Sequence, residues 1–138
     1  MARDEDETLP EAFWRVARLL RHRSREAMAP WDIAPSHGRA LAVLRRHGAL
    51  RLNELSEHLH IAPRSTTEVV DILQARGLVE RHPDPKDRRA TFVELTPEGH
   101  RIGDAIEANR AAEAERIFGA LSAGDREQLA RILRTLHG

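Results

Sequence analysis

The 138-residue chain contains no cysteine, which excludes disulfide bonds, thiolate metal sites and sensing by cysteine oxidation. It also lacks any apolar run near the roughly 18 residues that a membrane span requires. Its acidic amino terminus does not fit a secretory signal. We therefore expect a cytoplasmic protein that makes no contact with a membrane.

Net charge is absent as well, because 22 Lys and Arg residues balance 22 Asp and Glu residues. A strongly basic chain would have indicated nucleic acid directly, so an anionic partner has to be bound by a few well-placed cations. Lys86 is the only lysine. Almost all positive charge is therefore guanidinium, which suits bidentate contacts to phosphate and guanine. The codon bias of a GC-rich genome explains the same excess of arginine equally well.

Motifs of catalysis are also missing, since the chain has no Gly-rich phosphate loop, nucleophile elbow or HExxH helix. Its eight histidines raise the question of a metal site. His58 and His60 are two residues apart and diverge on a helix, whereas helical ligands need a spacing of four. A long-range site at His22, His37 and His100 stays open, but we expect no metal, no cofactor and no enzyme.

The segment from residue 52 to residue 95 has the pattern of a DNA reader. Residues 52–61 form a short amphipathic helix with Asn53 at its start. A turn at residues 62–67 leads into a second helix that ends at Arg76, with Gly77 as its C-cap. Two strands follow at residues 78–81 and 90–95, joined by a cation-rich turn at residues 82–89. A helix fits the major groove, and cations on a hairpin tip reach phosphates or a narrow minor groove.

Further helices are predicted at residues 10–27, 36–47 and 97–118, and a last one begins after Ser122. Ser36 and Thr96 are placed to cap the second and third of these, and Pro97 occupies the favoured first helical position. Together these elements predict a mostly α-helical fold. It has six helices around a winged helix-turn-helix, whose small β-hairpin is the wing.

The terminal helices carry apolar side chains that the predicted DNA-binding region, of some sixty residues, does not need for its own core. These are Phe13, Val16, Leu20, Ile117, Phe118, Leu121, Leu129, Ile132 and Leu136. Two-fold pairing of both chain ends would bury them in a homodimer, although a monomer that folds its ends together is the alternative. We therefore expect one continuous domain, with residues 1–35 and 97–138 for dimerisation and residues 36–96 for DNA binding.

Three short motifs make the chain resemble the multiple-antibiotic-resistance regulator (MarR) family of bacterial transcription factors. They are the run Arg76-Gly77-Leu78-Val79-Glu80-Arg81, the triplet Asp87-Arg88-Arg89 and, seven residues later, Thr96-Pro97-Glu98-Gly99. The resemblance extends to the order of the flanking helices and so covers nearly the whole chain. It implies a homodimeric regulator of transcription that binds an inverted-repeat operator in double-stranded DNA.

The predicted DNA-binding residues fall into two groups. The start of the second reader helix offers Pro63, Arg64, Ser65, Thr66 and Thr67. Arg pairs with guanine and hydroxyl groups contact phosphate, although Ser and Thr also serve as plain helix caps. The wing offers Lys86, Asp87, Arg88 and Arg89, which an ordinary solvated hairpin tip would also carry. By the resemblance, Asp87 shapes the wing and Arg89 enters the minor groove.

A small aromatic acid is the expected effector, since the resembled family often binds such anions near the helices that correspond to residues 10–27, 36–47 and 97–118, and then releases DNA. The predicted ligand-binding residues are Trp14, Arg18, His22, Trp31 and His37, which offer rings and cations, although two Trp are also typical of a core. The chain is thus predicted to be a ligand-released repressor. The alternative is a winged-helix module that binds protein, which the absence of net charge supports. Glu68 supports it too, because the resembled family often has a basic residue there.

Overall fold

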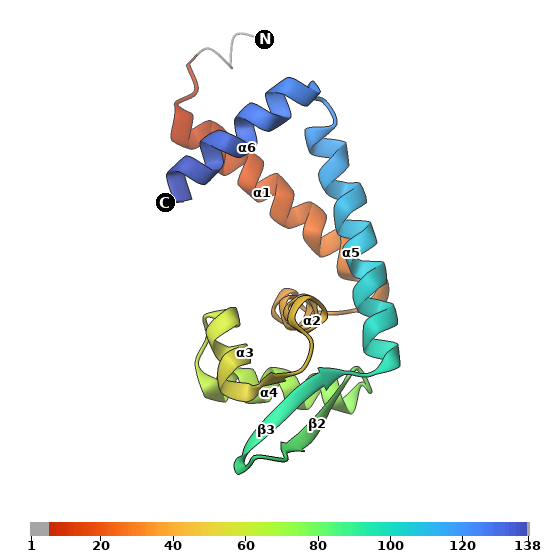
Figure 1. Cartoon of the computed structure of the whole chain (residues 1–138). Coiled ribbons are helices and arrows are strands. Elements are labelled where there is room, and N and C mark those ends of the chain that lie inside the picture. The colour runs from red at the N-terminus through yellow and green to blue at the C-terminus, as the bar shows by residue number, and fades with distance from the viewer. Residues whose placement is uncertain (1–5, 138) are drawn as a thin grey trace. The chain divides into compact units, whose positions relative to one another are not determined.

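The computed structural model describes residues 6–137, which divide into two compact units. Residues 28–109 form one unit, which we call the reading unit because it contains the two predicted reader helices and the wing. Residues 6–27 with 110–137 form the other, which we call the terminal unit. Along the chain, the described elements (Figure 1) are α1 (Leu9–Met28), η1 (Ala29–Trp31), α2 (Pro35–His47), β1 (Leu50–Arg51), α3 (Leu52–Leu59), α4 (Pro63–Ala75), β2 (Val79–Asp84), β3 (Asp87–Leu95), α5 (Pro97–Phe118) and α6 (Ala123–His137). The predicted mostly helical winged fold is confirmed.

The core of the reading unit lies where α2, α3 and α4 pack against a three-stranded antiparallel sheet of order β1-β3-β2. Leu55, Val70, Leu73 and Val93 are fully buried there. These residues come from α3, α4 and β3, so the reader helices and the wing share one core. Among the described helices, none has the length and apolar character that crossing a membrane would require.

The bounds of the two units differ from the predicted division at residues 35 and 97. Met28 and Ile33, which precede α2, are buried in the core of the reading unit, and so are Ile102 and Ile106 of α5. Both segments therefore belong to the reading unit, because their apolar side chains complete its core. α5 contributes its first part to the reading unit and its end to the terminal unit.

The first turn of α5 is fixed to the reading unit through Thr96. Its hydroxyl donates to the carbonyl of Gly77 at 2.7 Å and accepts the Gly99 N–H at 3.0 Å, which confirms Thr96 as the N-cap. A Cβ on Gly99 would lie 2.0 Å from the Leu78 carbonyl oxygen. Only glycine allows this approach, so the Thr-Pro-Glu-Gly motif combines a cap, a helix start and a close backbone contact.

Two predicted helix starts are wrong. α2 begins one residue before Ser36, with Ala34 as its N-cap and Pro35 as its first residue, because proline presets the helical φ angle. α3 begins before Asn53, with Arg51 as its N-cap. The backbone N–H of Arg51 donates to the Glu54 carboxylate at 3.1 Å, which fixes this end of the helix.

The wing is longer than predicted, because most of the turn expected at residues 82–89 is paired as strand. β2 runs to Asp84 and β3 starts at Asp87, so the connecting turn is Pro85-Lys86. Pro83 lies opposite Thr91 in the ladder, next to an irregularity in the register. β2 is an edge strand, and an edge strand tolerates a proline that cannot donate a ladder hydrogen bond.

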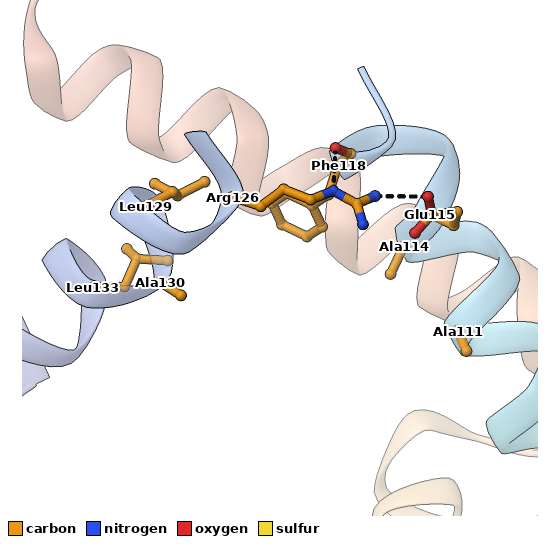
Figure 2. Close-up of a pocket in the computed structure, with 8 residues that line it drawn as sticks. All are labelled: Ala111, Ala114, Glu115, Phe118, Arg126, Leu129, Ala130 and Leu133. Carbon is orange, nitrogen blue, oxygen red and sulfur yellow. Dashed lines mark hydrogen bonds and ion pairs between the residues drawn. The ribbon is translucent and has the colours of Figure 1, made fainter. Parts of the chain in front are cut away.

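The terminal unit has almost no core of its own. Among its described residues, Ala27 alone is buried, and α6 buries none. Its exposed large apolar side chains are Leu9, Phe13, Trp14, Val16, Leu19, Ile132, Leu133 and Leu136. An apolar groove of about 300 Å³ lies between α5 and α6, lined by Ala111, Ala114, Glu115, Phe118, Arg126, Leu129, Ala130 and Leu133 (Figure 2). As predicted, Ser122 caps α6, because its hydroxyl accepts the Asp125 N–H at 3.1 Å.

Candidate DNA-binding surface

The joint between α3 and α4 is held by a buried pair of hydroxyl groups. The oxygen of the Ser56 hydroxyl lies 2.8 Å from that of Thr66, and Thr66 has no exposed surface. The prediction that Thr66 faces DNA is therefore corrected, because its hydroxyl fixes the angle between the two reader helices. The left-handed backbone of His60, at φ 54°, makes the turn between the helices.

The start of α4 is exposed and lacks a side-chain cap. Ala62 is the N-cap and Pro63 the first helical residue, so no side chain of the cap occupies the N–H groups of the first turn. Arg64, Ser65 and Thr67 are exposed around this end. An uncapped helix start attracts a phosphate through its N–H groups and its dipole. Four of the five predicted contact residues on α4 are thus accessible to a partner.

The backbone of the wing tip, which we define as residues 85–89, is shaped by two aspartates. Asp84 is buried and accepts the Lys86 N–H at 2.9 Å, while its other oxygen pairs with the Arg51 guanidinium at 2.6 Å. Asp87 accepts the Arg89 N–H at 3.0 Å. The acids of this basic segment therefore hold the turn, which agrees with the structural role that the resemblance implies for Asp87.

The cations of the tip are left free by this arrangement. Lys86, Arg88 and Arg89 are exposed, and within residues 6–137 their side chains have no ion-pair partner. The same holds for Arg64 on α4 within that range. Four unpaired positive side chains thus belong to two neighbouring elements of the reading unit, and Figure 1 shows the tip at the free end of the hairpin.

The sequence did not reveal the role of Arg51 in this surface. Its guanidinium pairs with Asp84, 33 residues away, and lies 5.7 Å from the centre of the Phe92 ring. No local pattern marks such a long-range pair. A polar hollow of about 270 Å³ opens beside it, lined by Arg51, Leu52, Asn53, Asp87, Arg89, Ala90 and Thr91. The hollow brings Arg89 of the tip beside the start of α3.

The motif Arg76 to Arg81 fixes the reader helix to its surroundings. Arg76 donates to the carbonyl of Trp31 at 2.5 Å and to that of Asp32 at 2.9 Å. Arg81 on β2 pairs with Asp71 and hydrogen-bonds Gln74, both on α4. These two arginines are therefore part of the frame that presents α4 and the wing.

The predicted effector residues are divided between the two units. Trp31 is half-buried against the core of the reading unit. Burial, and then the positive charge of Arg76, lowers the pKa of His37 in the same unit. Trp14, Arg18 and His22 are exposed on α1 in the terminal unit, where His22 lies 3.1 Å from Glu26. The prediction that these five side chains bind one ligand stays a prediction.

The Asp84–Arg51 pair gives a first test of how the tip is held. We expect Asp84→Ala to lower the free energy of unfolding by about 1.5–3 kcal/mol, the range for a hydrogen bond to a charged group. It should also speed hydrogen exchange at the Lys86 amide, because that N–H loses its acceptor. Denaturant unfolding and amide exchange measure the two effects.

Asp71→Ala is the matched control, because it removes an Asp–Arg pair in which the carboxylate is exposed. Such a pair contributes about 1 kcal/mol or less. Equal losses in the two variants, with unchanged exchange at Lys86, would contradict the role of Asp84.

Known proteins with similar sequences and structures are regulators of transcription. The family model described as MarR family matches residues 33–91. The uncharacterized regulator YsmB of Bacillus subtilis is 36% identical over 103 residues, which cover 75% of this chain and 70% of YsmB. The repressor MdtR of the same species is 31% identical, with 80% and 72% covered.

Solved structures agree with this assignment. A MarR family protein from Bacillus stearothermophilus superposes with a TM-score of 0.82 at 29% identity, covering 94% of this chain and 90% of that chain. RV1404 from Mycobacterium tuberculosis superposes with a TM-score of 0.79 at 29% identity, covering 93% and 88%. The chain therefore belongs to the MarR family of transcriptional regulators, which bind DNA and are not enzymes.

Proposed function

We propose that this chain is a homodimeric repressor that binds an inverted-repeat operator and is released by a small aromatic acid. The observation that carries the proposal is the pairing of an uncapped, exposed start of α4 with a wing tip whose cations are free. Both belong to one unit with a shared core. The bacterial cytoplasm is the compartment in which such a protein would meet its operator.

In this proposal α4 enters the major groove and its exposed start reads the bases. Arg64 is suited to a bidentate contact with guanine, and the Ser65 hydroxyl is suited to donate to a phosphate. The Thr67 hydroxyl donates to the Pro63 carbonyl at 3.0 Å, which leaves its oxygen lone pairs for an N–H or water donor. Pro63 orients the helix start and does not itself donate a hydrogen bond.

The wing tip supplies the second contact. Arg89 enters the narrow minor groove of an AT-rich flank, where the negative potential is enhanced. Lys86 and Arg88 contact phosphates, and Asp87 keeps the tip in shape through the Arg89 N–H. Because the chain has no net charge, binding depends on these local cations and on two copies acting together.

The terminal unit supports the homodimer. Its exposed apolar side chains and the groove between α5 and α6 are surfaces that a second copy would cover (Figure 2). Leu129 and Leu133 of α6 face Phe118 of α5 across that groove, and Arg126 closes one end by donating to the Phe118 carbonyl at 2.9 Å. Two-fold pairing would also double the reading surface, as an inverted repeat requires.

Repression is proposed from the relatives. MdtR of Bacillus subtilis and NicR of Pseudomonas putida are both named as transcriptional repressors. NicR is 35% identical to this chain over 96 residues. A repressor acts by occupying its operator, so a signal must lower that affinity to switch the gene on.

Removing the contact of α4 and removing the contact of the wing tip should reduce operator affinity in different ways. Arg64→Ala should weaken binding by about 1–3 kcal/mol at the best operator and relax the preference at one base position. Arg89→Ala should weaken binding most on operators with AT-rich flanks, where the minor groove is narrow. Fluorescence anisotropy with operators selected from random duplexes measures both effects.

Arg101→Ala is the control for loss of one positive charge, because Arg101 lies on α5 and is already paired with Glu98. It should leave affinity and base preference unchanged. Wild-type binding by both the Arg64 and the Arg89 variants would contradict the proposed surface and would favour a winged-helix module that binds protein.

If the terminal units pair in a homodimer, negative charges introduced on α6 should prevent the pairing. Ile132→Glu combined with Leu129→Glu should yield monomers, because two carboxylates in an apolar interface cannot be solvated. Light scattering should give twice 15.6 kDa for the unmodified chain and 15.6 kDa for the variant. Ile72→Glu is the control, since Ile72 is as exposed as Ile132, at 45%, but lies on α4. A monomeric unmodified protein at micromolar concentration would contradict the homodimer.

The effector is proposed to bind at Trp31 and His37, beside Arg76, while the contribution of Trp14, Arg18 and His22 stays a prediction. The half-buried indole can stack on an aromatic ring, and the Arg76 guanidinium, which lies near His37, can attract a carboxylate. Arg76 also hydrogen-bonds the backbone of Trp31. A ligand there would therefore touch a residue that fixes α4 in place.

Such a ligand releases DNA only if it binds the DNA-free protein more tightly than the protein in complex with its operator. A tenfold loss of operator affinity needs about 1.4 kcal/mol of that preference. Salicylate-like phenolic acids, titrated into the operator complex, should release DNA and change the Trp31 emission in a Trp14→Phe background. Trp31→Phe should weaken the response without weakening DNA binding. Flat emission and no release at millimolar acid would contradict the effector site.

A further inference from the structure

The outer face of the wing carries a cluster of three potential metal ligands. Glu80 and Glu94 are register partners on β2 and β3, so their side chains leave the same face of the sheet. His82 follows Glu80 by two residues and shares that face. Its Nε2 atom lies 2.7 Å from Glu94 Oε1 and 3.4 Å from Glu80 Oε2. One ligand atom from each residue lies within 4.8 Å of the other two.

Two carboxylates directly opposite each other on adjacent strands repel, and such pairs destabilise a hairpin unless a cation joins them. Within residues 6–137, the ion-pair partner of both carboxylates is the His82 imidazole. Two arginines of the same sheet are engaged elsewhere. Arg81 pairs with Asp71, and Arg51 pairs with Asp84. Therefore only His82 or a bound cation can relieve the repulsion between Glu80 and Glu94.

We propose that Glu80, His82 and Glu94 form a binding site for a divalent transition-metal ion of the zinc type. One imidazole nitrogen and two carboxylate oxygens are ligands that Zn²⁺ accepts. Tetrahedral ligands about 2.1 Å from zinc are separated by about 3.4 Å. The distance between His82 and Glu80 already has that value, whereas the 2.7 Å between His82 and Glu94 would have to widen, and the three ligand atoms all lie within 4.8 Å of one another. Three protein ligands leave one coordination position for water.

The backbone supports this assignment because all three ligands project from paired strands. Strands hold ligand geometry better than a loop does. The site is also distinct from the DNA-contacting tip, which begins at Pro85. A bound ion would join β2 to β3 and would neutralise two negative charges on the hairpin that carries the tip.

Calorimetric titration of the full-length, tag-free protein with zinc chloride, in chelator-treated buffer without DNA, tests the site. We expect one ion per chain at this site, and at least a tenfold loss of its affinity in His82→Ala and in Glu80→Gln. Zinc should also raise the melting temperature of the unmodified protein but not of His82→Ala. When metal is absent, Glu80→Gln should melt at least as high as the unmodified protein, because it removes the repulsion between Glu80 and Glu94, and His82→Ala should melt no higher, because it removes their ion-pair partner.

His22→Ala and His58→Ala are the controls. His22 pairs with a single carboxylate, that of Glu26, and His58 stacks on His47 with ring centres 4.2 Å apart. Both variants should bind zinc like the unmodified protein. No binding at tens of micromolar zinc, or unchanged affinity in His82→Ala, would overturn the proposal. Loss of the ion in either control variant would overturn it as well. None of these results depends on an operator, so they are separate from the tests of DNA binding.

Discussion

The approach of α5 to the backbone of Leu78 is the constraint on which the rest of the structure depends. A Cβ at Gly99 would lie 2.0 Å from the Leu78 carbonyl oxygen, and the same oxygen accepts the Thr96 N–H at 3.1 Å. The Leu78 N–H donates back to the Leu73 carbonyl of α4 at 2.9 Å. One short segment thus fixes the reader helix, the wing and the start of α5. In the proposed dimer, α5 is the element through which pairing of the terminal units reaches the reading units.

The distribution of charge explains how a chain without net charge can present a positive surface, as a member of a DNA-binding family requires. The two aspartates that flank the turn of the wing, Asp84 and Asp87, accept backbone N–H groups of the wing itself. Arg51, Arg76 and Arg81 are used in the same way, as parts of the frame. What remains free at the tip is positive. Local pairing rather than composition therefore sets the sign of the surface that DNA would meet.

Sequence patterns predicted the order of the elements, the Thr96 and Ser122 caps, and the basic tip, because each depends on neighbours within a few residues. They failed where the deciding partner is distant. The burial of Thr66 depends on Ser56 of another helix, and the shape of the tip depends on Arg51. The length of the wing was missed because Pro83 indicated a turn, whereas an edge strand accepts it. Burial removes Thr66 from the predicted contact residues, and the others stay predictions, because exposure alone does not identify the group that a side chain binds.

The central claim is that α4 and the wing tip of two chains read one symmetric site. Hydroxyl-radical footprinting of the protein on an operator selected from random duplexes tests it most directly. The account predicts two protected half-sites related by an inverted repeat, with centres about 10 base pairs apart, and additional minor-groove protection at both flanks. Protection of a single asymmetric half-site would contradict it. Flanking protection that persists on both strands when Arg89 is replaced by alanine would contradict it as well.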